Sequence, residues 1–142
     1  MSELPKKLEQ ILGDKIYKRD NKVKVKQALT RLDVNTSYSF NKFYEEYAGP
    51  FWDTFVPFEL LDIVEEKNNI ENYTYICRSE HSFPKHYLVL SEMSVNTVLV
   101  LDTLTDKVYK VDFEGGEELL LKGELREEWS TFYEFLLEYF NC

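Results

Sequence analysis

Two histidines and a cysteine are the first side chains in this sequence that could do chemistry. His81 and His86 stand five positions apart, and Cys77 lies four residues before them. Zinc sites combine such residues when three or four ligands recur at short, regular spacings. Cys77 is the only further candidate ligand nearby, and Pro84 breaks any helix that would align the two imidazoles. We therefore expect ordinary histidines and no metal site.

Paired carboxylates are the second candidate chemistry. Asp102 and Asp106 flank a predicted hairpin turn, where an aspartate usually bonds to the local backbone instead of acting in acid–base catalysis. The sequence has no Gly-x-Ser-x-Gly motif and no glycine-rich phosphate loop, and Gly115-Gly116 has acidic flanks. We expect no cofactor and no enzymatic activity. A small enzyme without a recognisable motif is the least favoured alternative.

Acidic residues and one aromatic segment indicate binding. The stretch 114–128 is rich in glutamate, and its candidate partner-binding residues are Glu114, Glu117, Glu118, Glu124 and Glu128. Such a run is most often a solvated face, and the alternative is a docking surface for a basic protein. Trp52, next to Asp53, also has two interpretations. Core filling is favoured for Trp52 and for its neighbours Phe51 and Phe55, and the alternative is that an exposed Trp52 anchors an interface.

The charge distribution favours a basic protein as the partner. The net charge is −9, but residues 1–31 carry nine Lys and Arg against four Asp and Glu. Residues 32–142 carry eight Lys and Arg against twenty-two Asp and Glu. An acidic surface repels nucleic-acid phosphates at long range. We therefore expect no nucleic-acid partner.

Length and composition indicate one folded cytoplasmic domain. A chain of 142 residues, 44% of them hydrophobic, buries enough apolar surface to offset the entropy of folding. No apolar stretch approaches the roughly 20 residues of a membrane span. The N-terminus does not resemble a signal peptide, and two cysteines do not make a disulfide framework. We expect no membrane partner, and the oligomeric state is left open.

The elements that must position these residues follow from periodicity. Helices are expected over residues 2–12, with Ser2 as a cap, and over 22–32, 36–48 and 127–140. Asn35, Thr36 and Ser37 are expected to cap the helix 36–48. Residues 58–72 are expected to form a strand that turns into a short helix. Segment 73–77 is compatible with either a strand or a helix, and so are residues 14–26.

An antiparallel meander is expected after the helices. Its strands are 87–91, 97–102 and 107–113, and residues 114–117 form a turn. The second strand is apolar nearly throughout, which predicts that it is central and that Leu99, Val100 and Leu101 are among the most buried residues. The sheet should pack against the helices 36–48 and 129–140. The predicted class is α+β.

The order of these elements resembles the SUKH superfamily, the Smi/Knr-type fold. The resemblance covers about residues 22–140. It rests on Tyr-Leu-Val-Leu-Ser, Asn-Thr-Val-Leu-Val-Leu-Asp, Thr-Asp-Lys-Val-Tyr-Lys-Val-Asp and the final Trp-Ser-Thr-Phe-Tyr-Glu-Phe-Leu segment. Two positions depart from the family pattern. Val34-Asn35 stands where Leu-Pro is typical, and Thr105-Asp106 stands where Thr-Gly is typical.

The resemblance implies a function. Bacterial members are largely immunity proteins that neutralise the toxic C-terminal domain of a secreted polymorphic toxin, often a nuclease or deaminase. Fungal relatives regulate cell-wall synthesis and signalling. The family has no catalytic motif. The expected function is that of a cytosolic immunity protein, or antitoxin, and the alternative is a non-enzymatic regulatory or scaffold protein of the cell-wall type.

Overall fold

Three antiparallel strands form the centre of the fold in this computed structural model, which describes residues 4–142. They are β1 (Tyr87–Val89), β2 (Thr97–Asp102) and β3 (Val108–Asp112), in the order β1-β2-β3. Val100 of β2 lies opposite Val89 on one side and Tyr109 on the other. Both Val100 and its neighbour Leu99 are completely buried. The predicted meander with a central second strand is confirmed.

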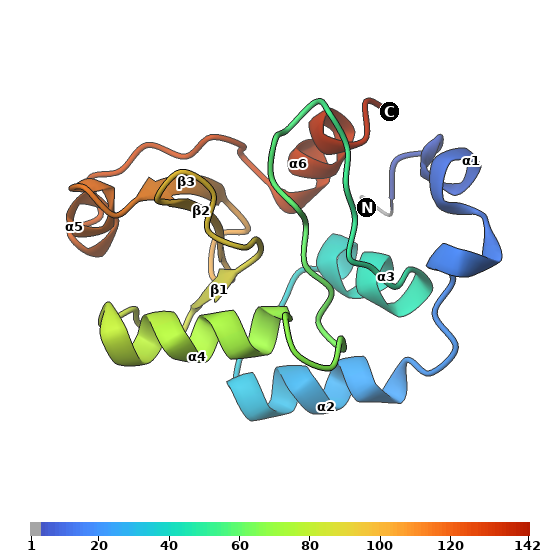
Figure 1. Ribbon diagram of the computed structural model, residues 1–142, viewed down its shortest axis with the longest axis horizontal. Helices are drawn as coiled ribbons and strands as arrows, with labels where there is room; N and C mark the ends of the chain where they lie inside the picture. Colours follow the sequence, from blue (N-terminus) through green and yellow to red (C-terminus); the bar gives the residue numbers. More distant parts are fainter. Residues whose placement is uncertain (1–3) are drawn as a thin grey trace.

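Helices surround this sheet, and the class is α+β as predicted. In residues 4–142 they are α1 (Leu8–Leu12), the 3₁₀-helix η1 (Lys15–Tyr17), α2 (Val23–Leu32), α3 (Tyr38–Glu46), α4 (Ile70–Glu80), α5 (Gly116–Leu121) and α6 (Phe132–Tyr139). Figure 1 shows α4 beside the sheet and α5 at one end of the molecule. Helices α3 and α6 lie on the side of the strands opposite to α5.

The alternating side chains of β2 divide the interior into two cores. Val98 and Val100 pack with residues of α4 and α5, including Cys77 and Leu120. Leu99 and Leu101 join a larger cluster that contains the apolar faces of α2, α3 and α6. Because β2 contacts apolar side chains on both faces of the sheet, its sequence is a continuous hydrophobic run.

The N-terminal end of α3 follows the sequence signal. The Ser37 hydroxyl accepts a hydrogen bond from the Phe40 N–H at 3.2 Å, as an N-cap does. The helix ends at Glu46, earlier than the predicted residue 48. Tyr47 is already extended and forms a bridge with Lys18, which draws the chain out of the helix before Gly49. Helix α2 confirms the helix expected over 22–32.

The C-terminal part of the chain corrects two predictions. The last helix begins at Phe132 and not at residue 127, because Thr131 caps it and Trp129 lies extended against Val108. The turn expected over 114–117 leads directly into α5, which was not predicted. Gly115 has φ 128°, a backbone conformation that only glycine adopts readily, and it starts this helix.

The N-terminal and middle segments differ from expectation as well. Helix α1 covers only Leu8–Leu12 of the predicted 2–12, and the proposed cap Ser2 lies outside the described residues. Residues 73–77 are helical, as part of α4. Residues 58–69 form neither the expected strand nor a helix. Leu60 makes only single bridges, to Phe51 and to Ser91.

Candidate functional site

The connection over residues 51–62 has no regular structure, and α6 holds it in place. The hydroxyl of buried Tyr139 lies 2.8 Å from the carbonyl oxygen of Phe51 and 2.7 Å from that of Phe58. It also accepts the N–H of Leu60 at 3.1 Å. Burial raises the pKa of Tyr139, so the hydroxyl keeps its proton and remains a donor. One side chain thus joins three points of the connection.

A second set of contacts secures the end of the same connection. The Tyr44 hydroxyl donates to the carbonyl oxygen of Leu61 at 2.9 Å, and the Leu61 N–H donates to Leu90 at 2.8 Å. Asp62 forms an ion pair with Arg19, and both side chains are about 95% buried. Because leaving either charge unpaired would be costly, this pair fixes where the connection ends.

Trp52 and Phe55 project from this rigid frame. Trp52 is 67% exposed and Phe55 is 52% exposed, whereas Phe51, Val56 and Phe58 are buried. The sequence favoured core filling for these rings, which is correct for Phe51 and wrong for Trp52 and Phe55. Asp53 makes a local contact, since its carboxylate accepts the Thr54 N–H at 2.8 Å. Because its ring is exposed, Trp52 is available to anchor an interface.

Trp52 lies in a row with two glutamates that the sequence analysis missed. The antiparallel bridges Phe51–Leu60 and Leu60–Ser91 bring three segments together. Trp52 therefore lies next to Glu59, and Glu59 lies next to Glu92. Burial and the neighbouring Glu92 carboxylate raise the pKa of Glu59, while a hydrogen bond from Trp52 opposes the shift. No spacing signal marks this row, because Glu59 and Glu92 are 33 positions apart.

An acidic groove continues from this row. It has a volume of about 370 Å³ and is lined by Pro50, Glu59, Glu65, Glu66, Lys67 and Asn68. Three carboxylates face one ammonium group there, and Glu65 and Glu66 are exposed. The surface next to Trp52 is therefore concave and negative.

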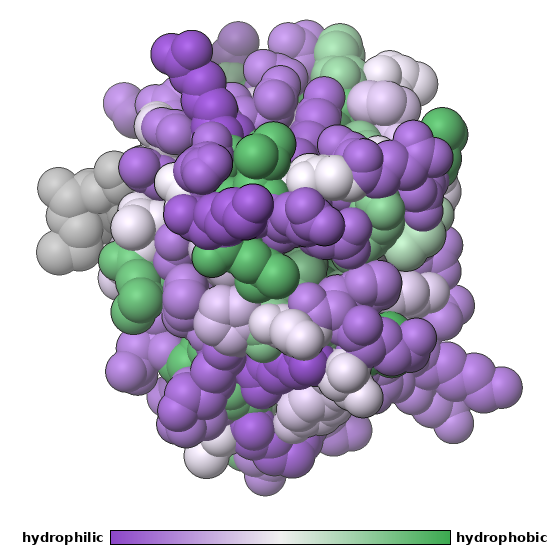
Figure 2. All heavy atoms as spheres, turned by 90° about the vertical axis from the view of Figure 1, so that its left-hand side faces the viewer, coloured by the Kyte–Doolittle hydropathy of each residue, from purple (hydrophilic) through white to green (hydrophobic). Residues whose placement is uncertain are grey.

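The acidic stretch 114–128 occupies a different part of the molecule. It includes α5, at one end of the long axis, and then follows the sheet towards α6, whereas the 51–62 connection runs alongside α6 (Figure 1). Glu114, Glu118, Glu124 and Glu128 are exposed. Figure 2, which faces this end, shows mostly hydrophilic residues with small apolar groups between them. The structure does not bring this stretch together with Trp52.

Two of the acids in this stretch have partners within the chain. Glu117 is only partly exposed and lies 3.4 Å from the Nδ1 atom of His81, so it connects α5 to the end of α4. Glu128 lies 3.8 Å from the ammonium group of Lys110. Glu117 is thus a structural contact, and the exposed docking candidates are the other four glutamates.

Cys77 and His86, which the sequence offered as candidates for chemistry, pack against other side chains of the protein. Burial, with Glu80 and Glu117 nearby, raises the pKa of Cys77 to about 11, so its thiol is protonated and a poor nucleophile at neutral pH. His86 packs on Tyr87, with ring centres 4.3 Å apart. Within residues 4–142, no group of three or more His, Cys, Asp or Glu is placed to hold a metal ion.

The two aspartates of the hairpin turn also bind the backbone. Asp102 accepts the Leu104 N–H at 2.9 Å, as the local-turn interpretation predicts. Asp106 reaches further and accepts the N–H of Phe132, the first residue of α6, at 3.2 Å. Burial raises the pKa of Asp106, and hydrogen bonds from Ser37 and Phe132 oppose the shift. Asp106 therefore ties the hairpin to α6.

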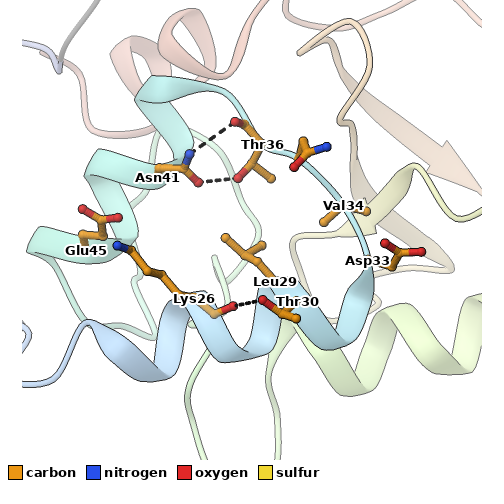
Figure 3. Close-up of a pocket in the computed structure, with 9 residues that line it drawn as sticks. Lys26, Leu29, Thr30, Asp33, Val34, Thr36, Asn41 and Glu45 are labelled. Carbon is orange, nitrogen blue, oxygen red and sulfur yellow. Dashed lines mark hydrogen bonds between the residues drawn. The ribbon is translucent and has the colours of Figure 1, made fainter.

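A second groove lies between α2 and α3 and has a volume of about 470 Å³. Several of its polar side chains are already paired. Thr36 and Asn41 bond to each other, and the Thr30 hydroxyl donates to the Lys26 carbonyl oxygen at 2.8 Å. Figure 3 shows the Lys26 side chain extended towards Glu45. Its lining carries two carboxylates and one ammonium group, so this groove is less acidic than the one that Glu59 lines.

Comparisons with known proteins add no identification. No family model matches the chain, and no curated protein matches it either. The resemblance to the SUKH superfamily stays a prediction. Across residues 4–142, no helix combines the length and the apolar character needed to cross a membrane.

Proposed function

We propose that the protein is a cytoplasmic immunity protein that binds and neutralises the toxic C-terminal domain of a secreted polymorphic toxin. The resemblance to the SUKH superfamily implies this function. The observation that carries it is Trp52, which is 67% exposed on a frame tied to α6 and bonds to Glu59, a residue that lines an acidic groove. A large exposed aromatic ring on a rigid support is a typical interface anchor.

The charge of the chain supports a basic partner. The net charge of −9 and the acidic groove complement a positively charged surface. A nuclease domain has such a surface, because it must bind phosphates. An acidic protein placed over that surface would exclude the nucleic acid. On this proposal inhibition is stoichiometric and needs no catalysis by the immunity protein.

Co-expression with the toxic domain tests the proposal. The partner to use is the C-terminal domain encoded directly upstream of this gene, and the readouts are co-purification and protection of cells. We expect a 1:1 complex for the wild type and loss of protection for Trp52→Ala. Tyr38→Ala is the control, since Tyr38 is 46% exposed on α3. Equal protection by both variants would contradict Trp52 as the anchor.

The same experiment separates the two non-enzymatic alternatives. A regulatory or scaffold protein of the cell-wall type would bind a cellular protein and give no protection from a toxin. If no toxin gene lies nearby and the protein forms a stable complex with a cellular protein, the proposed function is wrong and the regulatory or scaffold function takes its place.

A further inference from the structure

The surface formed by Trp52, Tyr73, Glu59 and Glu92, called here the Trp52–Glu92 surface, combines an exposed aromatic ring with two close carboxyl groups. Tyr73 comes from α4, and its hydroxyl donates to a carboxylate oxygen of Glu92 at 3.3 Å. Glu59 lies within hydrogen-bonding reach of both Trp52 and Glu92. Four side chains that are far apart in the sequence therefore meet at one place.

The two carboxyl groups are an unfavourable pair in the free protein. Burial first, and then the neighbouring carboxyl group of Glu92, disfavour ionisation of Glu59 and raise its pKa. In the part of the chain that the structure describes, neither of them takes part in an ion pair with Lys or Arg. A cation placed between them would remove the repulsion, so this surface gains more from a positive ligand than isolated carboxylates would.

From this geometry we infer that the Trp52–Glu92 surface receives an arginine side chain of a basic protein partner. The inference rests on the proposed function and adds the chemistry by which the partner is recognised. A guanidinium group is planar and carries several N–H donors in a fixed fork. It can stack on the exposed Trp52 ring while it donates to Glu59 and Glu92.

The surroundings of this surface favour a protein segment as the occupant. The groove that Glu59 shares continues past Glu65 and Glu66, which are exposed and complement further basic residues on either side of the arginine. Phe55, 52% exposed in the same connection, offers apolar area for the rest of a partner chain. Lysine fits less well, because its ammonium group is a compact charge that lacks the planar fork.

The frame around this surface keeps it ready for the partner. Tyr139 holds the segment that carries Trp52 and Glu59, and Tyr73 orients Glu92. Little chain entropy is lost when a ligand binds to side chains that are already positioned. The binding of a single arginine side chain can therefore be measured with a short peptide in place of the whole partner.

A peptide titration tests the inference. The probes are three synthetic peptides, Ac-Gly-Arg-Arg-Gly-NH2 and its lysine and citrulline counterparts, added to the full chain. The readouts are NMR shifts of the Trp52 indole N–H and of the Glu59 side-chain carboxyl. We expect the arginine peptide to shift both signals and to bind about two- to five-fold more tightly than the lysine peptide. The uncharged citrulline peptide should produce no shift.

Three variants connect the response to this surface. Glu59→Gln and Glu92→Gln should each weaken binding of the arginine peptide by about two- to five-fold. Glu80→Gln, at the exposed last residue of α4, removes the same charge elsewhere and should leave binding unchanged. Equal binding of the arginine and lysine peptides, or equal losses in all three variants, would show only diffuse attraction and overturn the inference. The assay contains no toxin, so peptide binding without toxin protection would refute the proposed function alone.

Discussion

At the scale of single residues, Val95 has an unfavourable backbone conformation. It stands with Asn96 in the two-residue turn between Ser94 and Thr97, which pair with each other through two hydrogen bonds. The φ angles are 48° for Val95 and 61° for Asn96, in the left-handed region. A β-branched side chain is crowded there. Val95 is 96% exposed, so packing does not compensate for the strain.

Replacement of Val95 by asparagine should therefore stabilise the protein. Asparagine tolerates the left-handed region, and we expect the free energy of unfolding to rise by about 1 kcal/mol. Urea denaturation measures it as a higher midpoint with an unchanged m-value. The control is Leu104→Asn, because Leu104 is 77% exposed in the other hairpin turn. An equal gain in both variants would show that removing exposed apolar area, and not strain, is responsible.

Glu59 gives a second residue-scale prediction, which concerns pH. The pKa of Glu59 is raised in the folded protein by burial and by Glu92. The folded state then holds this proton more tightly than the unfolded state, and stability falls as the pH rises through the raised pKa. Glu59→Gln removes this loss. We expect a gain of no more than about 0.5 kcal/mol at neutral pH, since the side chain is only partly buried and solvent still screens its charge.

Thermal unfolding from about pH 3 to pH 8 checks the Glu59 prediction. The difference between Glu59→Gln and wild type should grow with pH through the acidic range and then level off. Glu118→Gln should show no such dependence on pH. A constant difference at every pH would mean that the repulsion between Glu59 and Glu92 does not contribute to stability. The variant expected to be more stable is also the one expected to bind the arginine peptide less well.

At the scale of elements, α6 supports the segment that carries Trp52. Tyr139→Phe removes the hydroxyl that joins Phe51, Phe58 and Leu60. Loss of a buried hydrogen-bonding group of this kind typically costs about 1–3 kcal/mol. We also expect faster hydrogen exchange at the Leu60 amide and a weaker complex. Tyr133→Phe, at a partly buried position of the same helix, is the control and should change neither.

Local patterns predict most of the elements and little of the candidate site. The apolar run of β2 and the cap at Ser37 are local signals, and both are confirmed. The predicted start of the last helix is wrong because Trp129 is spaced from Phe132 as on one face of a helix. In the structure Trp129 lies in an extended segment against β3. The row of Trp52, Glu59 and Glu92 depends on single bridges between distant segments, and periodicity carries no information about those.

At the scale of the whole molecule, two acidic surfaces compete for the role of docking site. One surrounds α5 and the other borders Trp52, and they lie in separate parts of the fold (Figure 1). Both contribute to the net charge of −9, which on the proposed function attracts the basic toxic domain. Long-range attraction affects the association rate, whereas close contacts determine the dissociation rate. Rates measured with charge-reversed variants can therefore distinguish the two surfaces.

Two double variants change the charge equally in the two places. Glu118→Lys with Glu124→Lys reverses the α5 surface, and Glu65→Lys with Glu66→Lys reverses the groove next to Trp52. All four side chains are exposed, so folding should change little, and Glu117 is left intact because it contacts His81. Each pair takes the net charge from −9 to −5. Any difference between the pairs then reports position and not total charge.

We expect the groove pair to slow association with the toxic domain by about ten-fold at low salt and the α5 pair by about two-fold. The groove pair should also flatten the salt dependence of the association rate and speed dissociation, because its residues lie next to the anchor. Stopped-flow mixing across a salt series gives the association rate, and competition with unlabelled protein gives the dissociation rate. A larger effect of the α5 pair on both rates would place the docking surface at residues 114–128 instead of at Trp52. Rates that ignore salt and both reversals would mean that neither acidic surface faces the partner, since a charge within a Debye length of the interface cannot be reversed without changing the encounter.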